Sequence, residues 1–219
     1  MRPLAAALLV LLAGCAPVAE FSSEATDAPL PDYAQADGEV FRVDPSRSLL
    51  LVRTGRSGPA KRAGHDHAIA SESLAGFIEL HDDPDRARAD IAFAVRELIV
   101  DKPDYRQRLG LESEPSDSDI AGTYTNMLKV LTPEEHAWIT LSVRPAEPGV
   151  VSVSATVSGT TAEFLVPAEV SRDEDLVTVQ AELTVSHSDF GLQPFTALGG
   201  LLGVADELDV IVELTAVRR

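Results

Sequence analysis

The amino-acid sequence predicts a mainly β domain of about eight antiparallel strands with one short helical insertion. Apolar and polar residues alternate with a period of two in several separate runs, a pattern typical of a sheet that buries one face. A single stretch shows the longer period of an α-helix instead. Many short strands in one domain indicate either a barrel or a sandwich.

The alternation is clearest in the last third of the chain. In the run 177–185, Val179 and its apolar neighbours share one face, while Thr178 and Gln180 share the other. We therefore expect Val179 to point into the interior. Comparable runs occupy residues 91–95, 139–143, 151–157, 164–170 and 208–216.

The helical stretch lies before Trp138. Its apolar residues recur at helical spacing, and the polar segment 116–119 in front of them supplies a helix start. The segment 132–135 has the pattern of a capping box with proline at its first helical position, which predicts one more helical turn. The apolar positions of the main helix are Ile120, Tyr124, Met127, Leu128 and Leu131.

The N-terminus has the layout of a secretory signal. Arg2 precedes an apolar run, Leu4 to Leu12, that is far shorter than the roughly 20 residues that cross a bilayer. Leu12-Ala-Gly-Cys15 matches the bacterial lipobox, so we expect cleavage after residue 14 and lipidation of Cys15, the one cysteine of the chain. An ordinary signal with a chance cysteine is the alternative. Because acyl chains contribute about 0.8 kcal/mol per buried CH₂, they would attach the protein to a membrane.

Three segments follow from this reading: a signal peptide at 1–14, a flexible tether at 15–38 that is rich in Ala, Pro, Ser and acidic residues, and a folded domain at 39–219. The chain after residue 14 carries 17 basic and 35 acidic residues, a net charge of −18. Such a surface repels phosphate backbones, so we expect no nucleic-acid partner.

The predicted location is the cell envelope. Ala16 after the cysteine favours the periplasmic face of the outer membrane in a Gram-negative cell. In other cells the outer face of the cytoplasmic membrane is expected.

Four short segments, in this order, resemble the YceI-like family of secreted bacterial proteins: Phe41-Arg-Val-Asp-Pro-Ser-Arg-Ser48, Ala75-Gly-Phe77, Asn126-Met-Leu128 and Ser188-Asp-Phe-Gly191. The resemblance implies an antiparallel, lipocalin-like β-barrel and a polyisoprenoid-type lipid in its bore. Gly64-His-Asp-His67 resembles a variant branch of the family.

This Gly-His-Asp-His segment supplies the candidate site. His65 and His67 are two residues apart and point the same way on a strand, toward the face of Ile69. We expect His65, Asp66, His67, Val179 and Phe190 to contact the ligand.

Two other readings of the histidines stay open. The side chains of His65, His67 and His187, with Asp66 or Asp189, could bind a metal ion, or the histidines could be purely structural. Asp189 is expected mainly to accept backbone N–H bonds at a turn.

Two further features bear on function. The segment 198–204 is apolar and Gly-rich, and it could form a lip over the bore, a surface that meets a membrane, or a plug folded into the barrel. His81 and His136 lie in polar surroundings and are expected to have no specific role.

The sequence has no nucleophile elbow, phosphate-binding glycine loop or zinc-protease motif, so we expect a binding protein and not an enzyme. The predicted ligand is a long apolar lipid, with no cofactor and with protein partners unspecified. The alternatives are a metal- or redox-linked stress accessory protein that uses residues 64–67, and a packed barrel that binds other proteins.

Overall fold

A computed structural model describes residues 28–34 and 36–219, so the predicted signal peptide and Cys15 lie outside the described residues. The two α-helices are α1 (Pro103–Arg108) and α2 (Asp117–Leu131). The strands are β1 (Glu39–Val43), β2 (Leu49–Ser57), β3 (His67–Ser71), β4 (Ala75–Leu80), β5 (Arg88–Ala94), β6 (Ile99–Val100), β7 (Trp138–Glu147), β8 (Val150–Val157), β9 (Thr160–Arg172), β10 (Leu176–Ser186), β11 (Thr196–Ala197) and β12 (Leu202–Arg218).

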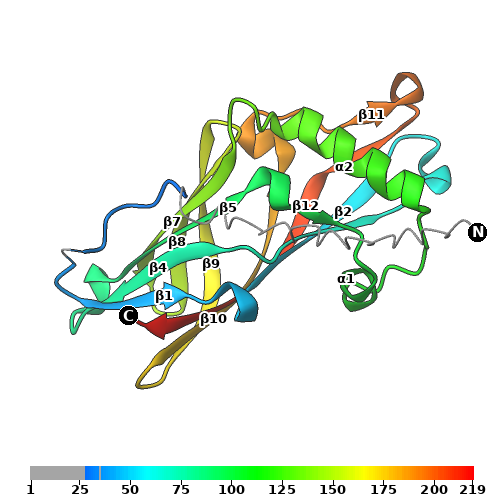
Figure 1. Ribbon diagram of the computed structural model, residues 1–219. Coiled ribbons are helices and arrows are strands. Elements are labelled where there is room, and N and C mark those ends of the chain that lie inside the picture. Colours follow the sequence, from blue (N-terminus) through cyan, green and yellow to red (C-terminus); the bar gives the residue numbers. More distant parts are fainter. Residues whose placement is uncertain (1–27, 35) are drawn as a thin grey trace, which may run out of the picture.

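The strands form one closed antiparallel barrel, which confirms the predicted fold class (Figure 1). Sheet order runs β1-β4-β5-β7-β8-β9-β10-β12-β2-β3-β6, and β1 also pairs with the end of β12, which closes the ring. Only short interruptions separate β1 from β2, β3 from β4 and β5 from β6. Each of these pairs acts as one bent strand, so the barrel has eight strands.

The side chains of the strands alternate between the interior and the outer surface, as predicted. Along β10, Thr178 and Gln180 are exposed while Val179 is not. Val179 lies opposite Leu214 of β12, and both face the interior. Cross-strand apolar pairs of this kind stabilise the sheet and keep its register, because a slip of one residue would expose the whole apolar face.

One end of the barrel is packed solid. The closed end, as we call it, is formed by Phe41 and Val43 of β1, Val177 of β10 and Ala216 of β12, all at most 3% exposed. Val43 and Val177 both pair with Ala216, so three strands meet there. The interior opens only beyond this layer.

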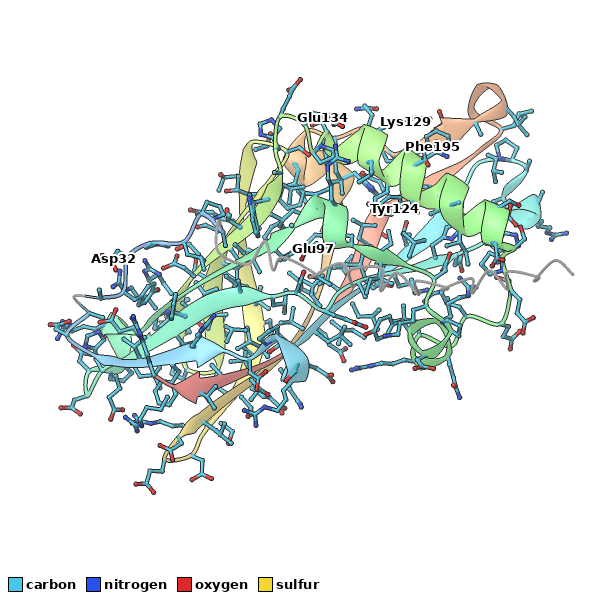
Figure 2. The ribbon with its side chains drawn as sticks, in the orientation of Figure 1. Asp32, Glu97, Tyr124, Lys129, Glu134 and Phe195 are labelled. Atoms are coloured by element: carbon cyan, nitrogen blue, oxygen red, sulfur yellow. The ribbon has the colours of Figure 1, made fainter. Side chains whose placement is uncertain are left out.

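Helix α2 covers a gap in the barrel wall. Within the described residues β7 pairs with β5 but not with β6, and α2 lies against β6 and the turn 95–97 (Figure 1). Tyr124, labelled in Figure 2, lies on α2, and its hydroxyl donates to the carbonyl of Arg96 in that turn at 2.8 Å. The helix starts at the predicted polar segment, where Ser116 and Asp119 form a capping box.

Of two further details of the helical region, one agrees with prediction and one does not. Thr132 takes the left-handed conformation (φ 44°) that ends α2, and the N–H groups of Glu135 and His136 then donate to its carbonyl, both at 3.0 Å, which forms the single further turn that was predicted. Helix α1 was not predicted, since six residues are too few to show a helical period. No helix among the described residues is long and apolar enough to cross a bilayer.

The end of the predicted tether contacts the barrel. Tyr33 is 3% exposed, stacks on Phe77, and donates its hydroxyl to Asp90 at 2.6 Å. Burial and this hydrogen bond raise the pKa of the Tyr33 phenol well above its usual value. Contacts with the domain therefore begin before β1.

Candidate ligand-binding bore

A cavity of about 440 Å³ occupies the barrel beyond the closed end, and we call it the bore. Its size falls in the usual range of ligand pockets, roughly 300–1,000 Å³. Inward side chains of the strands make most of its wall, and α2 adds Met127, Val130 and Leu131. The lining is apolar over most of its extent, and each of the eight strands contributes to it, for example through Val52, Ile78, Ile91, Leu141, Val153, Phe164, Val179 and Val210.

Two of the predicted ligand residues line the bore as expected. Val179 faces it from β10. Phe190 also lines it, from the 3-10 turn His187–Phe190, where its ring lies 6.0 Å from that of Phe164. Asp189 accepts a hydrogen bond from the backbone N–H of Ser186 at 2.7 Å, the structural role expected for it.

The Gly-His-Asp-His segment is divided between the two faces of the wall. His65 and His67 line the bore together with Ile69, as their spacing predicts. Asp66 does not line it: its carboxylate pairs with Arg56 at 3.2 Å and Arg53 at 3.6 Å outside. The placement of Asp66 in the ligand site was therefore wrong, because the residue between two inward-facing residues of an extended chain points outward.

His67 belongs to a buried polar network that the sequence did not reveal. Its Nδ1 lies 2.6 Å from the carboxylate of Asp101, which also accepts the N–H of Ala68 at 2.9 Å. Arg106 of α1 donates to the same carboxylate and to the carbonyl of Asp66. Asp101 is 2% and Arg106 6% exposed, so this charge pair is taken out of water.

Opposing effects act on the Asp101 carboxyl. Burial alone would raise its pKa, but the hydrogen bonds from His67, Ala68 and Arg106 outweigh burial and hold the pKa below its usual value. Asp101 is therefore a carboxylate that only accepts hydrogen bonds. Its backbone is left-handed (φ 55°), a conformation that aspartate tolerates better than most residues, but no local sequence pattern marks it as part of the site.

Further polar groups face this end of the bore. The hydroxyl of Thr123 on α2 lies 3.4 Å from Nε2 of His67, and Asn126 lines the cavity one turn further on. Nδ1 of His65 is buried and has no hydrogen-bond partner among residues 28–34 and 36–219. We call this region, defined by His65, His67 and Thr123, the histidine end.

The metal alternative gains no support from the geometry. His187 lines the bore, but its Nδ1 lies 3.0 Å from the carbonyl of Asp206. Among the described residues, His65, His67 and His187 do not come close enough together to form a group of metal ligands.

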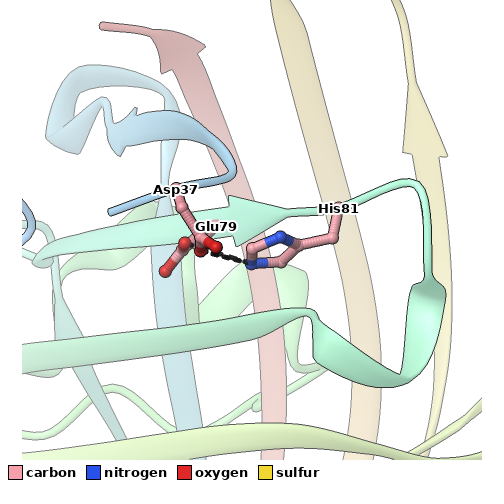
Figure 3. A group of neighbouring side chains, drawn as sticks. All are labelled: Asp37, Glu79 and His81. Atoms are coloured by element: carbon pink, nitrogen blue, oxygen red, sulfur yellow. Dashed lines mark ion pairs between the residues drawn. The ribbon is translucent and has the colours of Figure 1, made fainter. Parts of the chain in front are cut away.

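The described residues do bring Asp37, Glu79 and His81 together (Figure 3). Glu79 is 2% exposed and accepts hydrogen bonds from Arg88 at 2.5 Å and from the N–H of Gly38 at 3.0 Å, and Nε2 of His81 lies 3.0 Å from its carboxylate.

Arg86 pairs with Asp37 at 2.8 Å. Burial alone would raise the pKa of Glu79, but its hydrogen bonds with Arg88 and Gly38 outweigh burial and lower it. Because the two arginines already balance these carboxylates, the cluster ties the residues before β1 to β4 and β5. His81, for which no role was predicted, is part of this structural network.

The segment 198–204, which we call the lip, is only partly folded inward. Leu198 is 72% and Leu201 51% exposed, whereas Leu202 and Val204 line the bore. The positive φ angles of Gly199 and Gly200 make the turn between them. The lip is therefore no simple plug. It lies beside the β2–β3 loop, where the N–H of Ala60 donates to the carbonyl of Leu201 at 2.8 Å.

The sequence matches no family model and no curated protein. Similar solved structures include BcnA of Burkholderia cenocepacia, which is 15% identical over 80% of this chain and 99% of its own, with a TM-score of 0.52. A mutant of a protein described as CJ YceI is 10% identical over 67% of this chain and 81% of its own, with a TM-score of 0.45. At these identities the likeness to BcnA shows the fold, a closed eight-stranded antiparallel barrel.

Proposed function

We propose that this chain is a YceI-like lipoprotein of the variant Gly-His-Asp-His branch, whose barrel holds a long apolar, isoprenoid-like lipid in the cell envelope. The observation that carries the proposal is the apolar bore, which is open inside a barrel of this fold. We assign a binding role and no catalytic one. The resemblance to the YceI-like family supplies the isoprenoid class of the ligand.

The physical basis is burial of the ligand chain. Each CH₂ group transferred from water into an apolar bore contributes about 0.8 kcal/mol. Twelve such groups would contribute roughly 10 kcal/mol before the cost of ordering the ligand. A bore of this size also argues against the alternative of a solid barrel that only binds proteins.

The test is mass spectrometry of an organic extract of the purified domain, combined with binding of the apolar fluorophore N-phenyl-1-naphthylamine. Ala181 faces the bore, so Ala181→Trp should fill it and reduce binding at least tenfold. Glu182→Trp is the matched control, since Glu182 is exposed on the outer face of the same strand. No lipid in the extract and equal binding by the two variants would contradict the proposal.

The proposed attachment to the membrane depends on Cys15. Replacing it in Cys15→Ser removes the sulfur that would carry the diacylglycerol, so the variant should leave the membrane fraction or keep its signal peptide. Cell fractionation with detection of the chain length measures both. A variant that is processed and membrane-bound like the wild type would mean that Cys15 is not the anchor.

A further inference from the structure

The barrel wall has a second gap, between β9 and β10. The two strands pair over residues 168–172 and 177–181, next to the turn that joins them. Within the described residues, the remainder of β9, 160–167, pairs only with β8, and the remainder of β10, 182–186, pairs only with β12. We call the opening between these two unpaired edges the side gap.

Pro167 explains where the pairing of β9 with β10 stops. The N–H of Ala168 donates to the carbonyl of Gly149, on the β8 side, at 3.0 Å. Successive residues of a strand bond to opposite neighbours, so residue 167 bonds toward β10, where the register places Glu182 opposite it. Proline has no N–H to donate to the carbonyl of Glu182, and the ladder ends at this pair.

The facing edge of β10 is also kept from pairing with β9. The N–H of Ser186 points toward β9 by the same alternation, but it donates to the carboxylate of Asp189 at 2.7 Å. Glu163 and Glu182 are exposed on the two edges, and such charges discourage the addition of a strand from another chain. The side gap is therefore an opening and not a docking edge.

The bore lies directly behind the side gap. Phe164 and Val166 line it from β9, and Leu183 and Val185 line it from β10. Phe190 follows β10 in the chain, and its ring lies 6.0 Å from that of Phe164, centroid to centroid, so it bridges the two edges. Rotation of one side chain is a faster movement than displacement of a helix such as α2, which covers the other gap.

We propose that the apolar ligand enters and leaves the bore through the side gap, between β9 and β10, when the ring of Phe190 swings aside. Both edges carry apolar side chains on their inner side, so a ligand chain that passes between them stays in apolar surroundings. This inference rests on the proposed function, because it gives the route to the same bore.

The experiment measures the rates at which the purified protein takes up and releases N-phenyl-1-naphthylamine in solution, by stopped-flow fluorescence. Pro167→Val restores the missing N–H and should extend the ladder across the side gap. Both rates should then fall about fivefold, the worth of one net hydrogen bond, while the affinity stays unchanged. Pro145→Val is the matched control, since Pro145 is an exposed proline of β7, a strand that does not border the side gap.

A second variant opens the side gap. Phe190→Ala removes the bridging ring and should raise the rate of uptake about threefold, as expected for a cover that limits access. Weaker binding alone would change release and leave uptake as it is. Phe195→Ala is the matched control, because Phe195 lines the bore from the segment before β11 and not from the side gap.

The outcomes separate the two proposals. If the wild type does not bind the fluorophore, the proposed function fails. Slower amide exchange at Glu182 and Thr184 in Pro167→Val would show that the ladder has extended, and unchanged rates in that variant would overturn this inference. Uptake that is not faster in Phe190→Ala than in Phe195→Ala would also overturn it. This last comparison decides even if Pro167→Val does not extend the ladder.

Discussion

At the scale of single residues, strand parity decides which side chains can meet a ligand. His65 and His67 face the bore while Asp66, between them, pairs with arginines outside. The same rule separates Val179 from Thr178 on β10. Because successive side chains point to opposite faces, neighbouring substitutions in one strand should have very different effects.

Val179→Asp should destabilise the domain by about 3 kcal/mol or more, because a carboxylate would be placed in an apolar cavity without a partner. Thr178→Asp should cost no more than about 1 kcal/mol, since residue 178 is exposed. Urea unfolding of both variants measures the difference. If both variants lose the same free energy of unfolding, Val179 does not face the interior while Thr178 faces outward.

Asp101→Asn should lower the free energy of unfolding at pH 7 by about 3 kcal/mol, because it leaves the buried Arg106 unpaired. The pKa of Asp101 is lower in the folded than in the unfolded state, so its carboxylate stabilises the fold above the ordinary pKa of 3.8. That contribution is lost as the pH falls below this value. The difference in the free energy of unfolding between the wild type and Asp101→Asn should therefore become smaller in acid.

Urea unfolding at a series of pH values down to about 2 checks this. Glu97→Gln, an exposed carboxylate for which no ion pair is found within the described residues, is the control. If the difference in the free energy of unfolding between the wild type and Asp101→Asn stays constant with pH, Asp101 does not stabilise the fold through its charge.

At the scale of elements, the bore depends on a helix as well as on strands. α2 closes the wall where β6 and β7 do not pair, and it contributes Thr123 to the histidine end. α1 contributes Arg106, which holds Asp101 in place under His67. The two helices thus supply Thr123 and hold Asp101 in place, which the strands alone would not do.

Ser116→Ala should destabilise α2 by about 1 kcal/mol, since it removes the N-cap of the helix. Amide hydrogen exchange along residues 117–131 should accelerate about fivefold, while exchange in β10 stays unchanged. Thr125→Ala, at an exposed position in the middle of α2, is the control and should have little effect. Unchanged exchange in Ser116→Ala would show that packing on the barrel, and not the cap, determines the stability of α2.

At the scale of the whole molecule, the two ends of the barrel differ. The closed end is packed and braced by the Asp37–Glu79–His81 cluster, so a long ligand has no path through it. The lip and the β2–β3 loop lie at the other end, where exposed Lys61 and Arg62 stand next to two exposed leucines. We propose that the two leucines and two basic side chains make this end, and not the acidic remainder of the surface, the part of the molecule that can approach a membrane.

Leu198→Ser/Leu201→Ser should slow transfer of N-phenyl-1-naphthylamine from the protein to phosphatidylglycerol vesicles about tenfold, because the proposed membrane contact would lose two exposed leucine side chains. Equilibrium affinity for the probe should stay unchanged. Leu165→Ser is the control, since Leu165 is 71% exposed on the side of the barrel. Stopped-flow fluorescence measures the rates, and equal rates in all three proteins would mean that the lip has no part in transfer.

Much of the architecture could be predicted from the sequence, because it depends on local patterns. Alternation in the strands, the helical period of α2 and the spacing of His65 and His67 are properties of neighbouring residues, and each predicted which way side chains point. For the lip, by contrast, the sequence left an exposed segment and an inward plug as alternatives, and the structure contains part of each.

Only the tertiary structure decided which distant residues meet. Asp101 lies 34 positions from His67, and the two come together because β3 pairs with β6, whose end carries Asp101. No local pattern encodes that register, nor the pairing of Asp66 with Arg56 that takes it away from the bore. Whether the interior is open also depends on how all inward side chains fill one shared volume, and the residues of a single strand do not determine that sum.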